Sequence, residues 1–345
     1  NFFYFLLGSY SSSSIIIISI FFNIYCTWFA YKFLLQEIFA EKISISTNLI
    51  LFLSSIIFVS HPYVYDRMVT IGNTSYYFGI FSLLIIFWFK LINNTSNKIV
   101  FLFLIKFSLI TGLFFGMFPG QFYIFFIWLF LFELSYLLIN KNINRFVKSI
   151  LSIILILFFV VLINGHSVLT YITNPYFMDI NVMKSHYSDL DYLSIMSKSV
   201  SSIKNTFSQG IDFKYFQGKI ALSFSLIFYF SIFLFHKNKK FLSLYFTILI
   251  IHILSFGYQG YFKGIIGLLF EYAPGYGALR SPNKIIYILV FFKIFIFFYY
   301  LDKLLQKKTL TKYRLILIIF ICTFFIFNFG KLIKNNNISD LYSKI

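Results

Sequence analysis

Apolar runs long enough to cross a lipid bilayer recur along the whole chain. A transmembrane helix needs about 20 predominantly apolar residues, and fewer where flanking side chains reach the interface. Such runs lie near residues 15–36, 45–60, 76–92, 99–118, 120–139, 147–164, 219–235, 241–257, 284–301 and 314–330. Charged residues make up only 12% of the chain, about half the share found in a soluble domain. The sequence therefore predicts an all-α, polytopic transmembrane bundle of about ten helices, with short amphipathic or re-entrant segments on its outer side.

Basic residues concentrate in alternate connections between these runs. The connections after the odd-numbered runs hold Lys32 and Lys42, then Lys90 and Lys98, then Lys141, Arg145 and Lys148, then Lys237, Lys239 and Lys240, and finally Lys303, Lys307, Lys308, Lys312 and Arg314. By the positive-inside rule these connections are cytoplasmic. The other connections, 61–75, 119–120, 165–218 and 257–283, then lie outside. Membrane topology thus explains the net charge of +18, and we expect no nucleic-acid partner.

We expect residues 1–345 to form a single multispan membrane domain, located in the plasma membrane with the lipid bilayer as its surroundings. Residues 165–218 are an extended polar segment that is too short for an independent domain. We therefore interpret them as an outer loop insertion. The chain begins at Asn1 without a Met, inside an apolar stretch, so we expect it to be an excerpt of a longer protein.

The first polar patch on the predicted outer side spans residues 61–79. An apolar run ends there at His61, and Asp66 and Arg67 are adjacent. In one interpretation these charges are solvated, and an aromatic belt anchors the headgroup zone. That belt consists of Tyr63, Tyr65, Tyr76 and Tyr77. In the functional interpretation Asp66 is a base or an acidic ligand, and the planar guanidinium of Arg67 holds an anionic group such as phosphate.

The second patch spans residues 260–284. It contains Glu271, a Pro-Gly turn, and then Arg280 and Lys284 around the expected start of a helix. Prolines and glycines give the backbone a non-helical path, which is tolerated at membrane depth only where protein or a water-filled cavity covers it. The patch is either a phosphate-binding corner, since helix N-termini favour anions, or a structural re-entrant loop with cations that reach the interface.

Charged residues inside the apolar runs form a third group. Lys106 and Glu133 either pair between helices, because isolated charges at depth are costly, or Lys106 extends to the cytoplasmic interface instead. Lys293 is a further charge within a run. We expect three other polar residues to pack or to hydrogen-bond between helices rather than to bind a ligand; these are Asn23, Asn164 and His252.

Two sequence segments resemble corners of known membrane proteins. The segment HPYVYDRMVTIGNTSYYFGIFSLLIIF, at 61–87, is similar to a stretch of the pattern (N/H)P-(F/Y)-V-Y-(D/E)-R in large polytopic proteins of archaea and bacteria. The segment YAPGYGALRSPNKIIYILV, at 272–290, is similar to their PG…(F/L)R-x-P-x-K corner. Related corners occur in YfhO-type proteins and in the membrane part of the large arabinofuranosyltransferases, which belong to or sit beside the GT-C glycosyltransferase superfamily.

The resemblance implies transfer of a sugar from a polyprenyl-phosphate donor to a glycan, lipid or protein acceptor on the outer face. Asp66 would be the general base, and the phosphate would be bound by Arg67, Arg280 and Lys284, with His61 and Glu271 beside them. GT-C enzymes usually keep their catalytic acid in the first outer loop, which we expect to precede Asn1. We therefore assign the catalytic role to Asp66 in place of that acid.

Proteins of the GT-C class often use a divalent metal, but no ligand cluster in the sequence demands one, and the sequence identifies no cofactor. Two other functions stay open. The chain is either a transporter or flippase for a lipid-linked or anionic substrate, or a non-catalytic membrane scaffold. The sequence alone therefore leaves open whether the chain is an enzyme.

Overall fold

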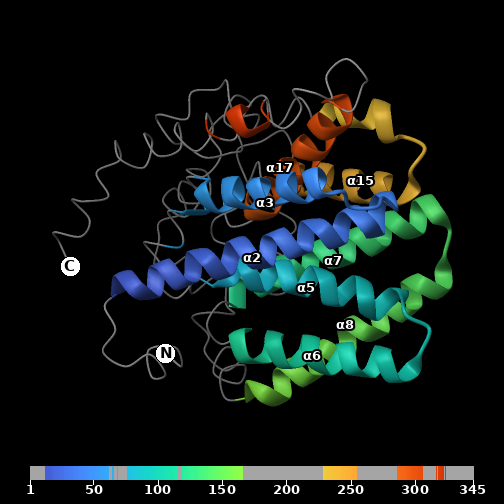
Figure 1. Cartoon of the computed structure of the whole chain (residues 1–345). Coiled ribbons are helices and arrows are strands. Elements are labelled where there is room, and N and C mark those ends of the chain that lie inside the picture. Colours follow the sequence, from blue (N-terminus) through green and yellow to red (C-terminus); the bar gives the residue numbers. More distant parts are fainter. Residues whose placement is uncertain are drawn as a thin grey trace, which may run out of the picture. The chain divides into compact units, whose positions relative to one another are not determined.

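The computed structural model describes residues 12–61, 64–65, 68, 76–115, 119–165, 228–254, 286–305, 316, 318–321 and 323. In these residues all regular secondary structure is helical (Figure 1). The helices with assigned bounds are α2 (Ser12–Phe39), α3 (Ile45–Ser60), α5 (Tyr77–Asn93), α6 (Asn97–Phe115), α7 (Pro119–Asn140), α8 (Ile143–Ile163), α15 (Lys239–Leu254) and α17 (Ile286–Leu305).

The predicted apolar runs and the observed helices coincide. Each helix with assigned bounds overlaps one predicted run, and α3 has the predicted limits. The predicted runs at 219–235 and 314–330 are described only in part, and their described residues are helical. The prediction of an all-α fold is therefore confirmed for the described part of the chain.

Three of the described helices are long and apolar enough to cross a membrane. They cover Ile17–Phe39, Asn97–Phe114 and Ile143–Ile163. Three further apolar helices are shorter, at Ile45–Ser60, Tyr77–Asn93 and Ile124–Asn140. The predicted total of about ten spans and the assignment of sides stay predictions.

The chain folds into two compact units that divide α5 between Ile86 and Phe87. Unit 1 contains α2, α3, the beginning of α5 and α17 from Val290 onward. Aromatic packing forms its core: the Phe291 ring meets those of Phe58 and Phe81 edge to face, with centroids 5.4 and 5.3 Å apart. The Tyr31 hydroxyl donates to the Phe291 carbonyl at 2.9 Å. These contacts join α17 to α2, α3 and α5, which lie much earlier in the sequence.

Unit 2 contains the end of α5 with α6, α7, α8 and α15. Within it α15 packs on α7, and α6 packs on α8; Figure 1 shows α6 and α8 side by side. Rings of Phe125, Trp128 and Phe132 stack along α7. At the other contact a Cβ on Gly112 would lie 2.6 Å from Ile163 Cδ1. Gly112 therefore sets the close approach of α6 and α8.

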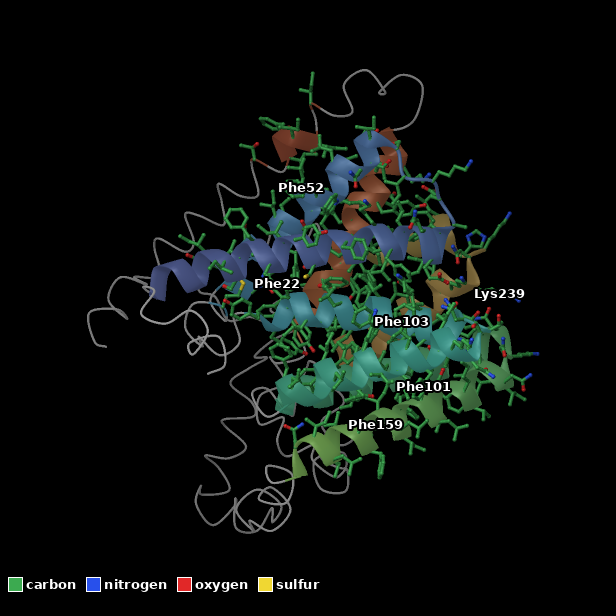
Figure 2. All side chains as sticks on the ribbon, turned by 60° about the horizontal axis from the view of Figure 1, so that its bottom comes forward. Phe22, Phe52, Phe101, Phe103, Phe159 and Lys239 are labelled. Atoms are coloured by element: carbon green, nitrogen blue, oxygen red, sulfur yellow. The ribbon has the colours of Figure 1, made fainter. Side chains whose placement is uncertain are left out.

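The connections predicted to be cytoplasmic come together within each unit. In unit 2, the connections at 94–96, 141–142 and 236–238 lie at the same end of the helices (Figures 1 and 2). In unit 1, Glu41 in the α2–α3 connection forms an ion pair with Lys303 in the last turn of α17, with Lys303 Nζ 2.5 Å from Glu41 Oε1. This clustering is what the predicted alternation of sides requires of each unit separately.

The helices of unit 2 expose apolar side chains. In Figure 2 carbon atoms cover much of the outside of α6 and α8. The exposed side chains of α8 include Leu151, Ile154, Phe158 and Leu162. In the most apolar stretch of α8, only 22% of the residues are buried. A contiguous apolar surface of this kind marks contact with another apolar phase or partner, which fits a helix that faces lipid.

Candidate functional site

Among the residues that the sequence nominates for the site, the structure describes only His61. Asp66, Arg67, Glu271, Arg280 and Lys284 lie outside the described residues. Residues 166–218 of the outer loop insertion also lie outside them. The roles of these residues and their convergence on one site stay predictions.

His61 forms the end of α3 and the beginning of the first outer corner. Its backbone is extended, with φ −60° and ψ 130°, and its N–H donates to the Phe58 carbonyl at 3.2 Å. The side chain is buried, with 2% exposure. The Tyr65 N–H donates in turn to the His61 carbonyl at 2.9 Å, so the chain turns back immediately after α3.

The residues on both sides of Asp66-Arg67 are packed into unit 1. Val64 and Met68 are fully buried. Asn23 of α2 connects this corner to the next helix, because its Nδ2 donates to Met68 Sδ at 3.1 Å and its Oδ1 accepts from the Gly79 N–H of α5. Asn23 therefore links Met68 to the start of α5. The prediction that Asn23 hydrogen-bonds between helices is confirmed.

Tyr76 and Tyr77 lie inside unit 1 and not on its rim. They are 8% and 1% exposed, and the Tyr76 ring meets the Phe22 ring of α2 edge to face, with centroids 5.8 Å apart. The aromatic-belt interpretation is wrong for these two residues, because α2 covers the start of α5. Tyr63 is outside the described residues.

Replacing Gly79 with Ala is expected to lower the free energy of unfolding by about 1–3 kcal/mol, the usual cost of overpacking. The added Cβ would lie 2.6 Å from Phe22 Cε1 and 2.9 Å from Asn23 Oδ1. Thermal unfolding in detergent micelles measures the loss. Gly165→Ala is the matched control, since a Cβ there meets nothing within 4 Å. Equal melting temperatures for the two variants would contradict this packing.

A buried ion pair joins α7 and α8 in unit 2. Arg145 Nε donates to Glu133 Oε2 at 2.9 Å, and Arg145 Nη2 donates to Glu133 Oε1 at 2.9 Å. Trp88 of α5 donates from Nε1 to the same Oε1 at 3.0 Å, and Arg145 Nη1 donates to Asn93 Oδ1 at 2.6 Å. The guanidinium also lies 4.1 Å from the centroid of the Tyr136 ring. We call these five residues the Glu133 network.

The alternative in which Lys106 pairs with Glu133 is wrong. Glu133 binds Arg145, while Lys106 is exposed, with its Nζ 5.8 Å from the Phe103 ring centroid. Arg145 follows the short connection between α7 and α8, so its fork reaches back to Glu133 with two parallel N–H groups. An ammonium cannot match that bidentate geometry.

Lys148 caps the end of α5 from α8. Its Nζ donates to the carbonyls of Ile92 and Asn94, at 2.8 and 2.7 Å. The last carbonyls of a helix have no partner within the helix, and a cation there also interacts favourably with the helix dipole. Lys148 and the Glu133 network together hold α5, α7 and α8 at the predicted cytoplasmic end.

The Glu133 network is structural and not catalytic. Glu133 is 1% exposed, and both of its carboxylate oxygens accept hydrogen bonds from Trp88 or Arg145. A general base needs access to the proton it removes, which a carboxylate enclosed in this way does not have. The sequence signals for the network were a single acid in an apolar run and an arginine after the next turn.

A smaller polar cluster joins the ends of α2, α3 and α17 in unit 1. The Tyr299 hydroxyl donates to Glu41 Oε1 at 2.7 Å, beside the Lys303–Glu41 ion pair. Thr47 Oγ1 donates to Asp302 Oδ2 at 3.4 Å, and Asp302 is buried. Lys293, in the middle of α17, is fully buried. These contacts again fix helix ends.

Asn164 at the end of α8 confirms a second predicted interhelical hydrogen bond. Its Nδ2 donates to the Gly112 carbonyl of α6 at 2.6 Å. His252 is buried in α15. Within the described ranges, no cluster of three or more His, Cys, Asp or Glu side chains is arranged to hold a metal ion.

No family model, curated protein or solved structure matches this chain. The described residues therefore define a helical protein in which three helices are long and apolar enough to cross a membrane. A more specific assignment rests on the two sequence segments 61–87 and 272–290.

Proposed function

We propose that the chain is a multispan integral membrane protein of GT-C type that transfers a sugar from a polyprenyl-phosphate donor on the outer face. The acceptor is a glycan, a lipid or a protein. Two features support the proposal: the apolar helices with exposed apolar faces, and the sequence corners at 61–87 and 272–290.

The observation that carries the proposal is the packing of the first corner. His61, Val64 and Met68, which precede or follow the Asp66-Arg67 pair in the sequence, are buried, and Asn23 of α2 contacts both Met68 and the start of α5. A catalytic group must be held on a rigid support, because small misplacements from the productive geometry cost large factors in rate. A charged pair between anchored neighbours satisfies this condition better than a pair on a solvated loop would.

The proposed reaction assigns each charged group one step. Asp66 accepts the proton of the acceptor hydroxyl. The hydroxyl oxygen then forms a bond to the anomeric carbon as the bond between that carbon and the phosphate oxygen breaks. The polyprenyl phosphate leaves with the bonding electron pair, and its negative charge is stabilised by Arg67, Arg280 and Lys284. His61 and Glu271 complete the binding surface, and no step requires a metal.

The convergence of the two corners is tested by a distance measurement. Cys26 and Cys322 are replaced with Ala, and spin labels are attached to cysteines introduced at positions 66 and 280 of the full chain in lipid nanodiscs. We expect a Cα separation below roughly 15 Å, the reach of two long side chains that donate charge-assisted hydrogen bonds to one phosphate. A much longer separation would exclude a single phosphate site.

A second labelled pair controls for topology. Positions 66 and 239 lie on opposite predicted sides, so their separation is expected to be about 30 Å or more, the thickness of the hydrocarbon core. A short distance for this pair would overturn the predicted arrangement of sides, independently of the result for the first pair.

A further inference from the structure

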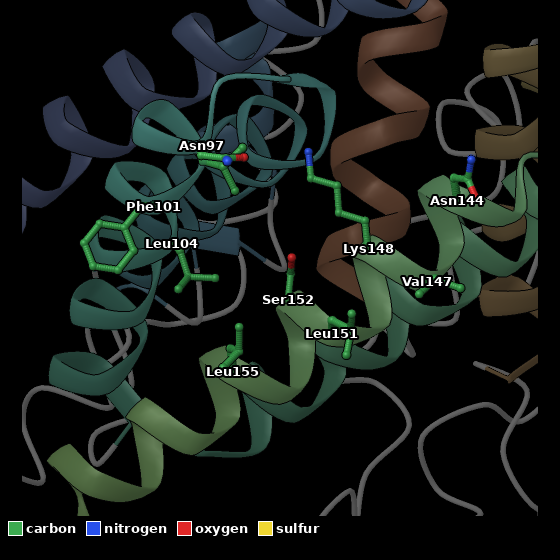
Figure 3. A pocket seen from close by; sticks show the side chains of 10 residues that line it. Asn97, Phe101, Leu104, Asn144, Val147, Lys148, Leu151, Ser152 and Leu155 are labelled. Carbon is green, nitrogen blue, oxygen red and sulfur yellow. The ribbon is translucent and has the colours of Figure 1, made fainter.

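A groove of about 540 Å³ runs between α6 and α8 in unit 2 (Figure 3). Its polar end is formed by Asn97, Asn144 and Lys148, and its apolar part by Leu104, Leu151 and Leu155. The figure shows the Lys148 side chain reaching toward the α6 side of the groove, with Leu151 and Leu155 further along α8 and Leu104 on α6. One cation, two amides and an apolar floor thus follow one another along the same groove.

From this arrangement we infer that the groove binds an anionic phospholipid, with its phosphate at Lys148 and one acyl chain along Leu104, Leu151 and Leu155. The inference concerns the predicted cytoplasmic end of unit 2 and does not depend on sugar transfer at the outer face.

The first argument is the donor capacity of Lys148. Its ammonium has three N–H donors, and the carbonyls of Ile92 and Asn94 accept two of them. The third N–H of the ammonium donates to a ligand in the groove. The two carbonyl contacts also fix the position of the ammonium, so little side-chain entropy is lost when an anion binds. The amides of Asn97 and Asn144 supply further donors for phosphate oxygens.

The second argument is charge complementarity. The charge of Arg145 is neutralised by Glu133, whereas no ion pair involving Lys148 occurs among the described contacts. Lys98 in the first turn of α6 and Lys141 in the α7–α8 connection are exposed. Among the described residues of unit 2, Glu133 is the only Asp or Glu. The end of the helices around Lys148 therefore carries a net positive charge. Basic pockets between transmembrane helices on the cytoplasmic side suit anionic headgroups.

The third argument is the match between the groove and an amphiphile. Leu151 and Leu155 are exposed apolar side chains, and Phe101 on the facing side of α6 is exposed as well. An acyl chain would cover them without any loss of hydrogen bonds, and each buried methylene contributes favourably. A free phosphate ion would leave this apolar part uncovered, so the whole groove fits a lipid better.

The test measures binding of defined lipids to the purified full chain in detergent micelles. Phosphatidylglycerol and phosphatidylcholine with identical acyl chains are titrated separately, and retained lipid is counted by native mass spectrometry. We expect phosphatidylglycerol to bind more tightly, and Lys148→Gln to weaken its binding about tenfold, as loss of a hydrogen bond from a charged group does. Lys106→Gln is the matched control, because Lys106 is an exposed lysine on α6 outside the groove, and it is expected to leave binding unchanged.

A second variant keeps the inference falsifiable if Lys148→Gln also disturbs the end of α5. Leu155→Trp fills the apolar part of the groove, about two helical turns from Lys148, and its side chain starts from an exposed position; it is expected to weaken lipid binding while leaving the secondary structure intact. Equal binding of the two lipids, equal effects of Lys148→Gln and Lys106→Gln, or unchanged binding by Leu155→Trp would each overturn the inference. Displacement of the lipid by millimolar inorganic phosphate would identify free phosphate as the ligand and overturn it as well.

Discussion

Glu133→Leu is expected to lower the free energy of unfolding by about 3–5 kcal/mol, the usual cost of removing one partner from a buried ion pair. The substitution would leave the Arg145 guanidinium in a site where its side chain is only 10% exposed. It would also remove the acceptor of the Trp88 indole N–H. Denaturant titration in detergent micelles measures the loss, followed by the fluorescence of the chain's three tryptophans, Trp28, Trp88 and Trp128.

Two variants separate the network from a general effect of charge. The double variant Glu133→Leu with Arg145→Leu removes both charges, and we expect it to recover most of the lost stability, because apolar replacements of a whole buried pair are often neutral. Glu41→Gln breaks the Lys303–Glu41 pair, whose side chains are 29% and 28% exposed, and is expected to cost about 1 kcal/mol or less. A double variant as unstable as Glu133→Leu would contradict the ion-pair explanation.

Asp66→Asn is expected to reduce sugar transfer about 10²–10⁴-fold, the contribution of a positioned general base. The carboxamide keeps the size of the side chain and loses the ability to accept the proton of the acceptor hydroxyl. The assay follows a labelled sugar from a polyprenyl-phosphate donor into product with the full chain in proteoliposomes. Glu41→Gln, at the predicted cytoplasmic end, is the control and should retain activity.

The same experiment distinguishes the proposed enzyme from the alternatives. A transporter or flippase would move the intact donor across the membrane without forming product, and Asp66→Asn would leave its chemistry unaffected because no bond is made. Wild-type transfer that equals Asp66→Asn transfer would remove Asp66 from the catalytic role. Unchanged thermal unfolding of Asp66→Asn shows that a loss of transfer is not a loss of folding.

The positions of the helices could be predicted from the sequence because they follow from local features. The helix Ile45–Ser60 is apolar, and a His-Pro pair follows its last residue. It begins directly after Ser44, whose side chain caps the helix by accepting a hydrogen bond from the Thr47 N–H. A proline removes a backbone donor and restricts the residue before it. Hydrophobicity and turn residues of this kind act within a few residues, so the sequence displays them directly.

The candidate site could be predicted only in part. The sequence nominated residues 61–79 after α3, and the structure adds that Val64, Met68, Tyr76 and Tyr77 within this segment are buried. Nothing in the order of residues distinguished a solvated aromatic belt from a packed corner. That difference depends on α2, which lies earlier in the chain and covers the start of α5 through Phe22 and Asn23.

For the described residues, the sequence by itself determined that they are helical, where the helices lie and which connections are basic. Only the tertiary structure decided that Glu133 binds Arg145, that Gly79 and Gly112 are close contacts, and that α6 and α8 enclose a groove beside Lys148. The physical reason is that helices that are apolar on every side carry no amphipathic stripe to indicate which face is buried. Their rotation and neighbours are set by small residues and a few polar contacts between distant segments.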